Sequence, residues 1–86
     1  MSKLVCISGC SRGLGYAMAG EFSSRGWKVA GGARTVEGLQ RLQKELNTDH
    51  FLHPFDVTIP ADVDSFAGKV EQNLGIPDLL INNAGL

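Results

Sequence analysis

The fold of this 86-residue chain is decided by the stretch Ser8-Gly9-Cys10-Ser11-Arg12-Gly13-Leu14-Gly15. It follows a short apolar run, residues 3–8, which predicts a strand buried on both faces of a sheet. It also opens residues 13–25, where apolar side chains recur at helical spacing. Glycines between a strand and a helix allow a sharp turn and bring the N–H groups of the helix N-terminus next to a phosphate. The stretch therefore predicts a phosphate-binding turn within a β–α unit.

Each glycine of this turn has its own expected role. Gly9 would allow the sharp exit from the strand, Gly13 would let the main chain approach a pyrophosphate, and Gly15 would let the helix press against the sheet. The spacing GxxxGxG differs from the GxGxxG of long-chain dinucleotide dehydrogenases, and a P-loop is excluded because no lysine follows Gly15. Three glycines in an ordinary loop are the alternative, which the order of strand, turn and helix disfavours.

The rest of the chain continues the alternation of extended and helical stretches. Strands are predicted at residues 27–33, 50–56 and 78–82, the first weakened by Gly31-Gly32 and the second limited to an edge or exit position by Pro54. Helices are predicted from the N-cap Thr35 and at residues 61–74, and Gly26 should end the first helix. The order βαβαβαβ predicts an α/β fold, a partial Rossmann-like, doubly wound parallel sheet of four strands. The expected inner faces are Leu14, Ala17, Met18 and Phe22, then Leu39, Leu42 and Leu46, then Val63, Phe66, Ala67, Val70 and Leu74.

Composition excludes several classes of protein. The hydrophobic fraction of 43% and charged fraction of 20% are those of a globular chain, and a net charge of −1 without a basic stripe argues against nucleic-acid binding. No apolar run approaches the ~18 residues of a membrane helix. Cys6 and Cys10 are too few for a disulfide framework, so we expect a reducing compartment, the cytoplasm. His50 and His53 have no third ligand nearby, so no metal site is predicted.

Two further motifs follow the later strands. Asp56-Val57 comes after the third strand, and Asn82-Asn83-Ala84-Gly85 comes after the fourth. With the glycine turn, they resemble the short-chain dehydrogenases/reductases, whose motifs are TGxxxGIG or TGxxxGAG, an Asp-Val pair and NNAG. Ser8 stands for the usual Thr and keeps a hydroxyl, and Leu14 stands for the usual Ile or Ala. The resemblance spans the whole chain but only the N-terminal part of the family.

The resemblance implies a nicotinamide dinucleotide as cofactor. The turn backbone, residues 9–14, would hold the pyrophosphate and the adjoining ribose, with Gly15 packing beneath it. The carboxylate of Asp56 would accept from the adenine amino group beside the Val57 backbone; a capping or turn aspartate is the alternative. Asn82, Ala84 and Gly85 would line the ribose on the nicotinamide side, whereas Asn83 would tie neighbouring strands together. A plain strand-end turn is the alternative for this asparagine pair.

The end of the second strand distinguishes NAD from NADP. An acidic residue there binds the ribose 2′-hydroxyl and would repel a 2′-phosphate. This chain has Ala33 where the family carries the acid and Arg34 at the basic position of NADP-preferring members, with no carboxylate until Glu37. Arg12 is a second cation that would reach the same phosphate, and a guanidinium suits phosphate. We therefore expect NADP(H), although each arginine alone fits a solvated surface position.

The family's catalytic Ser, Tyr and Lys, with their YxxxK pattern, lie beyond NNAG, and this chain ends at Leu86 without them. Tyr16 has no lysine four residues later, so we expect it to pack rather than to catalyse. Residues 1–86 are thus predicted to be the NADP(H)-binding part of an oxidoreductase that transfers hydride between NADP(H) and a carbonyl or alcohol substrate, truncated after NNAG and inactive alone.

Other interpretations stay open. The chain would alternatively be a non-catalytic nucleotide-binding or dimer-interfering short form, or another doubly wound domain with a coincidental turn, and a homo-oligomer is also compatible with the sequence. In the order 3-2-1-4-5 of such sheets, residues 79–81 would form an exposed apolar edge unless a further strand covers them. Cys10, near a helix N-terminus, is either a reactive thiol of lowered pKa or a small loop residue.

Overall fold

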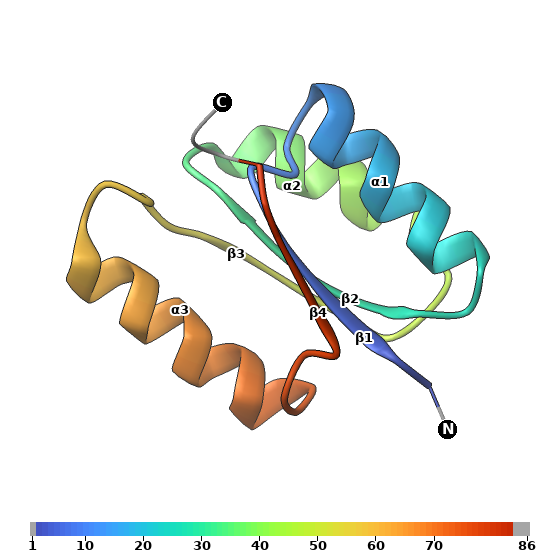
Figure 1. The fold of residues 1–86 in the computed structure, drawn as a ribbon. Helices are drawn as coiled ribbons and strands as arrows, with labels where there is room; N and C mark the ends of the chain where they lie inside the picture. The colour runs from blue at the N-terminus through green and yellow to red at the C-terminus, as the bar shows by residue number, and fades with distance from the viewer. Residues whose placement is uncertain (1, 84–86) are drawn as a thin grey trace.

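The computed structural model describes residues 2–83 and contains one parallel sheet with helices on both of its faces (Figure 1). This arrangement confirms the predicted α/β, doubly wound fold, and the predicted elements agree with the observed ones to within two residues at most ends. The elements in chain order are β1 (Leu4–Ser8), α1 (Gly13–Ser24), β2 (Lys28–Ala33), α2 (Val36–Gln43), β3 (His50–Pro54), α3 (Pro60–Asn73) and β4 (Leu79–Asn82).

The strand order β3-β2-β1-β4 is the one expected for this topology. The chain runs outward from β1 through β2 to β3 and then returns, by way of α3, to the other side of β1. As a result, α1 and α2 cover one face of the sheet and α3 covers the other (Figure 1). The change of direction next to β1 leaves a crevice at the carboxyl ends of the strands, where open α/β sheets bind their ligands.

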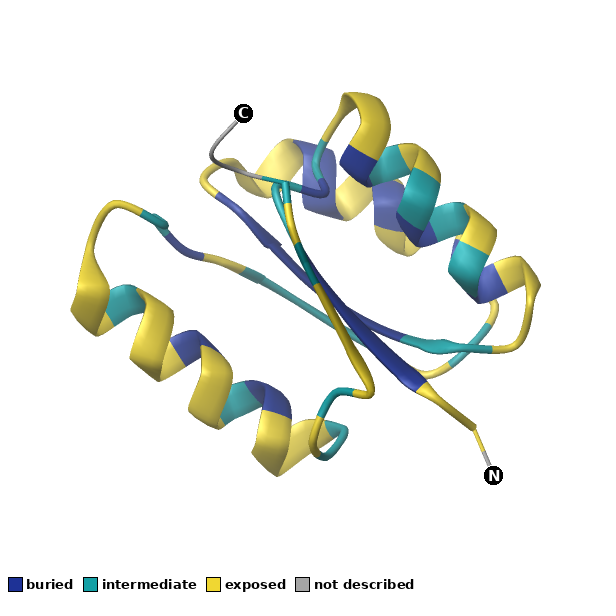
Figure 2. Ribbon diagram, viewed as in Figure 1, coloured by how far each residue is buried: buried dark blue, intermediate teal, exposed yellow. Residues whose placement is uncertain are grey.

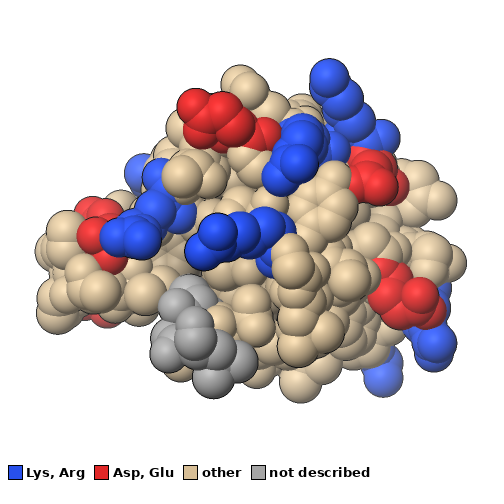
Figure 3. All heavy atoms as spheres, turned by 90° about the horizontal axis from the view of Figure 1, so that it is seen from above, with Lys and Arg blue, Asp and Glu red and all other residues tan. Residues whose placement is uncertain are grey.

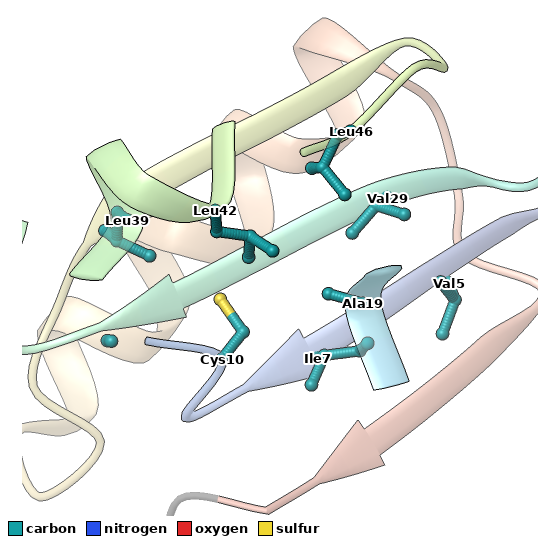
Figure 4. Close-up of a cluster of buried hydrophobic side chains, with 9 residues drawn as sticks. Val5, Ile7, Cys10, Ala19, Val29, Leu39, Leu42 and Leu46 are labelled. Carbon is teal, nitrogen blue, oxygen red and sulfur yellow. The ribbon is translucent and has the colours of Figure 1, made fainter. Parts of the chain in front are cut away.

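Two apolar clusters hold the layers together, one on each face of the sheet. Successive residues of β1 contribute to opposite clusters, because side chains alternate across a strand. Val5 and Ile7 pack against α1 and α2, with Leu42 fully buried among them (Figure 4). The predicted inner stripe of α2 is confirmed for Leu39 and Leu42, whereas Leu46 is buried in the same cluster but follows the end of the helix. On the other face, Leu4 and Cys6 pack with Phe66 and Val70 of α3. Figure 2 shows the contrast between buried β1 and the largely exposed outer side of α3.

The predicted inner face of α1 is right for Met18 and Phe22, which pack partly buried against the core, and wrong for Leu14 and Ala17. Leu14 is 65% exposed and Ala17 is also exposed, whereas the buried residues are Gly15, Ala19 and Ser23, four positions apart. The reason is the close approach of helix and sheet: a Cβ at Gly15 would lie 2.2 Å from the carbonyl oxygen of Gly9. Small residues therefore form the contact.

The end of α1 is as predicted. Gly26 has a φ of 88°, which favours glycine, and its N–H donates to the Ser23 carbonyl oxygen at 3.0 Å. The Trp27 N–H donates to the Phe22 carbonyl oxygen at 3.0 Å, and the two rings meet edge to face with centroids 4.9 Å apart. This capping motif turns the chain directly into β2.

The Gly31-Gly32 pair is a packing device rather than the weak point we predicted in β2. A Cβ at Gly31 would lie 2.6 Å from the Cys10 sulfur, and one at Gly32 would lie 2.1 Å from the Phe55 ring. The two glycines therefore admit Cys10 on one face of the sheet and Phe55 on the other. Pro54 ends β3, which forms one edge of the sheet as predicted.

The sheet has an open side at β4 and α3. Leu79 is 40% and Leu80 72% exposed, which confirms the apolar edge expected for residues 79–81. In α3, Phe66 and Val70 are buried as predicted, but Val63 is 39% exposed and Ala67 is also exposed, because no described element lies over that part of the helix. Within residues 2–83, no helix is long and apolar enough to cross a lipid bilayer.

Candidate functional site

The glycine turn leaves β1 and leans directly against β2. Gly9 has a φ of 71°, and its N–H donates to the Gly32 carbonyl oxygen at 2.7 Å; the Cys10 N–H donates to the same oxygen at 3.3 Å. Gly13 has a φ of 61°, so the turn uses two residues in the region of backbone space that disfavours side chains. The sharp exit predicted for Gly9 is therefore observed.

The N-terminus of α1 is left open for an anion. Its N-cap residue, Arg12, makes no side-chain capping bond, and the first turn of the helix carries no acidic residue. A Cβ at Gly13 would meet nothing within 4 Å, so the backbone there faces open space. Uncapped N–H groups at the positive end of a helix bind phosphate well. The turn thus fits a pyrophosphate on its geometry alone.

A cleft of about 700 Å³ lies above the carboxyl ends of the strands. It brings together most of the site residues expected from the sequence: the glycine turn, Arg34, Asp56 and Val57. The residues that line it are Gly9, Ser11, Arg12, Gly13, Ala33, Arg34, Thr35, Phe55, Asp56, Val57, Thr58 and Asn83.

Several expected site residues lie elsewhere. Leu14 is not part of the cleft wall, and Gly15 is buried beneath the turn, as its predicted packing role requires. Asn82 lines a second, neighbouring groove of about 550 Å³ between α3 and β4. Ala84 and Gly85 lie outside the described residues.

The wall of the cleft carries a net positive charge. Arg12 and Arg34 are exposed and come from two different loops, yet both line the cleft, as does Ala33 at the end of β2. Among the described lining residues, Asp56 is the one carboxylate. Figure 3, which looks onto this end of the molecule, shows Lys and Arg side chains across the upper half of the view, one group near the middle, with Asp and Glu side chains among them. The two arginines of the cleft wall favour a ligand that carries phosphate.

Asp56 is held in a turn by the residue two positions later. Its Oδ1 accepts from the Thr58 N–H at 2.9 Å and from the Thr58 hydroxyl at 2.7 Å. These two bonds, first that from the hydroxyl, keep the pKa of Asp56 below its ordinary value, and the charge of Arg34 adds to the effect. Asp56 is therefore a turn aspartate, as the alternative interpretation expected, because its Oδ1 accepts both bonds from Thr58. Its carboxylate also lines the cleft, and the lowered pKa favours the ionised form.

Asn83 ties the turn to β4. Its side-chain Nδ2 donates to the Gly9 carbonyl oxygen at 3.0 Å, and its backbone N–H donates to the Ser8 hydroxyl at 3.1 Å. That hydroxyl also lies 3.1 Å from Oδ1 of Asn82. The hydroxyl that Ser8 shares with the family's usual Thr is therefore used to join β1 to β4.

Sequence reasoning missed Phe55 and Thr58 as cleft residues. Phe55 is 8% exposed and stacks on Phe66 at 4.3 Å between centroids, so the wall of the cleft is fixed by packing on the far side of the sheet. An apolar residue at the end of a strand gives no local sign of such a role. Thr58 was recognisable in principle, because Asp-x-Thr is a frequent side-chain-to-backbone turn.

Cys10 and the two histidines were the remaining candidates for a reactive or metal-binding group. Cys10 is fully buried, and burial raises its pKa to about 12, so the alternative of a reactive thiol is wrong. His50 Nδ1 lies 3.0 Å from the Thr48 carbonyl oxygen, and His53 Nε2 lies 3.2 Å from Nζ of Lys69. Residues 2–83 contain no cluster of three side chains suited to a metal ion.

The sequence matches the family model of the short chain dehydrogenases over residues 3–86. The chain belongs to this family. An NADPH-dependent pterin aldehyde reductase of Arabidopsis thaliana is 42% identical over 86 residues, covering 98% of this chain and 36% of the relative. A 3-oxoacyl-(acyl-carrier-protein) reductase of Escherichia coli is 36% identical over 84 residues, covering 98% of this chain and 34% of the relative.

Solved structures agree with this assignment. A metagenomic short-chain oxidoreductase in complex with NADP superposes with a TM-score of 0.91 at 32% identity. The match covers 100% of this chain and 41% of that one. The chain thus spans about a third of the length of the first curated relatives it matches, and these relatives include an NADPH-dependent reductase.

Proposed function

We propose that this chain binds NADP(H) in the cleft at the carboxyl ends of its strands, as the cofactor-binding part of a short-chain oxidoreductase. The observation that carries the proposal is the convergence of Arg12 and Arg34 on the cleft that also contains the glycine turn, with Ala33 in place of an acid. A guanidinium pair suits the 2′-phosphate, which distinguishes NADP from NAD.

Different residues of the chain would bind different parts of the dinucleotide. The turn and the uncapped α1 N-terminus hold the pyrophosphate and adjoining ribose. Asp56, kept ionised by Thr58, accepts a hydrogen bond from the adenine amino group beside the Val57 backbone. Asn82, Ala84 and Gly85 are proposed to line the nicotinamide-side ribose, as the family pattern implies. When bound, the nicotinamide supplies or accepts the hydride.

The reaction and its setting are part of the same proposal. Residues 1–86 would serve as the N-terminal NADP(H)-binding segment of an enzyme that interconverts a carbonyl and an alcohol, consistent with the relatives named as reductases. The buried, unpaired Cys6 and Cys10 are compatible with the reducing cytoplasm. Tyr16 contacts Glu45 and Arg41 and is proposed to have no part in the chemistry.

The test is a titration of the chain and three variants with NADPH and NADH. Arg34→Ala should weaken NADPH binding by about ten- to a hundredfold, because a charge-assisted bond to phosphate is lost, and should leave NADH nearly unchanged. Ala33→Asp should lower the NADPH to NADH affinity ratio by placing a carboxylate beside the 2′-phosphate. Arg25→Ala is the matched control, since Arg25 is also exposed but pairs with Glu21 at the far end of α1.

Equal losses for the two cofactors in Arg34→Ala would contradict the assignment of the 2′-phosphate to this loop. If Arg25→Ala lost as much NADPH affinity as Arg34→Ala, the loss would reflect the net charge of the chain and not a specific contact of Arg34 with the 2′-phosphate.

A further inference from the structure

Helix α2 packs closely against Ser11 of the glycine turn. Gly38, buried in α2, faces Ser11 so closely that a Cβ there would lie 2.5 Å from the Ser11 Cβ and 2.6 Å from its carbonyl oxygen. Real Cβ contacts are essentially never this short, so any side chain at Gly38 would displace either the helix or the turn. The cofactor motif of the family does not include this residue.

A second contact joins the same two segments one helical turn later. Arg41 Nη2 donates to the Ser11 carbonyl oxygen at 3.3 Å. The Arg41 guanidinium also lies over the Tyr16 ring of α1, with 5.7 Å between Cζ and the ring centroid. The Tyr16 hydroxyl in turn donates to the carboxylate of Glu45, which follows α2. Arg41 is thereby held against both the turn and α1.

These contacts complete the support of the turn. Its first residue, Gly9, is fixed from below by the carbonyl of Gly32 in β2 and by the side chain of Asn83. The middle of the turn, at Ser11, is held by α2, through the contacts of Gly38 and Arg41. Ser11 and Arg12 both line the cleft, so a displacement of Ser11 moves a wall residue and a cation together.

We propose that Gly38 and Arg41 are positioning residues that set the place of Ser11 and Arg12 in the cleft and so determine the affinity for the nicotinamide dinucleotide. The inference rests on the proposed function, because the ligand is the one assigned there. Neither residue lines the cleft, so each acts through the turn.

The main test is Gly38→Ala with two matched controls. Gly20→Ala and Gly68→Ala make the same substitution in α1 and α3, where a Cβ would meet nothing within 4 Å. We expect Gly38→Ala to weaken NADPH binding by about ten- to a hundredfold, the loss expected when displacement of Ser11 and Arg12 breaks one charge-assisted hydrogen bond to the ligand. The controls should stay within about twofold of the original chain, as surface substitutions usually do.

A second pair of variants avoids the buried position. Arg41 is exposed, so Arg41→Met removes the donor to Ser11 without disturbing the core, and we expect about a fivefold loss of NADPH affinity from the lost hydrogen bond. Arg41→Lys keeps the charge and a donor and should recover most of the loss. An unchanged affinity in Arg41→Met, or in a Gly38→Ala chain that keeps its circular dichroism spectrum, would overturn the inference.

A ligand-free measurement separates the inference from the proposed function. In two-dimensional ¹⁵N–¹H spectra without cofactor, the Ser11 and Arg12 amides should shift in Gly38→Ala and Arg41→Met but not in Gly20→Ala or Gly68→Ala. If the original chain fails to bind NADPH while these amides shift, the proposed function is wrong, and only the structural part of the inference, that Gly38 and Arg41 set the place of Ser11 and Arg12, is supported. If the original chain binds NADPH and these amides stay in place in both variants, the positioning role is wrong.

Discussion

Strands β1 and β4 lie next to each other in register, and both are short apolar runs, yet they differ sharply in burial. Cys6 pairs with Leu80 and Ile7 with Ile81. Ile7 is fully buried, whereas Leu80 is 72% exposed. An apolar run thus predicts a strand, but its neighbours decide whether that strand is covered. Within residues 2–83, β1 has a strand on each side and β4 has one.

The cleft and the groove beside these strands differ in their lining. The cleft above β1 and β2 is built from close backbone contacts at glycines and is lined by two arginines. The groove between α3 and β4 is lined mainly by apolar side chains, among them Val63, Phe66 and Leu80. The first suits a phosphate-bearing ligand, and the second suits an apolar covering segment. From this difference we propose that the ligand binds in the charged, tightly constrained cleft rather than in the apolar groove.

The largest contrast should appear in stability. Ile7→Ala removes a fully buried side chain and should lower the free energy of unfolding by about 2–5 kcal/mol, whereas Leu80→Ala at the open edge should change it by no more than about 0.5 kcal/mol. Urea denaturation measures both values. Where Ile7→Ala leaves too little folded chain, Ile7→Val should cost about 0.5–1.5 kcal/mol. A cost for Leu80→Ala equal to that of Ile7→Ala would show that β4 is covered in solution.

The next contrast concerns the glycines of α1. Gly15→Ala places a Cβ 2.2 Å from the Gly9 carbonyl oxygen and should destabilise the chain by about 1–3 kcal/mol, the usual cost of overpacking. Gly20→Ala meets open space and should stabilise it by about 0.4–1 kcal/mol. Thermal unfolding of the two variants gives the comparison. Equal effects would mean that α1 lies further from the sheet than described.

The two thiols report on the two regions separately. Burial raises the pKa of Cys6 to about 11 and that of Cys10 to about 12, and Cys6 also lines the open groove. We expect iodoacetamide at pH 8 to alkylate Cys6 before Cys10, and both more slowly than in the urea-unfolded chain. Peptide mass mapping over time measures the order. Faster modification of Cys10 would mean that the region beneath the glycine turn opens more readily than the groove.

The same pKa values give a dependence of stability on alkaline pH. Because both folded-state values lie above the ordinary 9.0, the unfolded chain loses its thiol protons first. The stabilisation is complete below pH 9.0 and is lost as the pH rises toward 11 and 12. Cys10→Ala should reduce this alkaline loss, as measured by urea midpoints across that range. An identical pH profile in the variant would contradict the burial of Cys10.

The smallest expected effect is at Asp56. Its pKa is lowered mainly by the Thr58 bonds, so the carboxylate stays charged at and below its ordinary pKa of 3.8, and its contribution is lost only as the pH falls through the lower folded-state value. Thr58→Val should move the pKa upward toward 3.8. Carbon-detected NMR of the side-chain carboxyl group measures it. An unchanged titration in Thr58→Val would show that the Thr58 hydroxyl does not hold Oδ1 in solution.

The sequence predicted most of the fold because the residues that end or orient each helix and strand act within that element. Gly26, Pro54 and the leucines of α2 each act through their own element, so spacing alone places them. Two of the four residues predicted for the inner face of α1 were wrong, because hydrophobicity selected Leu14 and Ala17, whereas the buried positions of the helix are small residues. Gly31 and Gly32 were misread for the same reason, since the partners that require them, Cys10 and Phe55, come from other parts of the chain.

Much of the candidate site was also predictable, because the motif residues follow consecutive strands of one parallel sheet. What the sequence could not give was the support behind them. Phe55 takes its place from stacking on Phe66, and Gly38 matters only because α2 passes within contact distance of Ser11. Such roles arise from tertiary proximity and leave no periodic or compositional sign.

The central claim is that the arginine-lined cleft, and not the apolar groove, binds NADP(H). The most direct test is an NADPH titration of the ¹⁵N-labelled chain followed by two-dimensional NMR. We predict saturable shifts of the Gly13, Arg34 and Asp56 amides, with Val70 and Leu80 unaffected. Shifts confined to Val70 and Leu80, or none at millimolar NADPH, would contradict the claim.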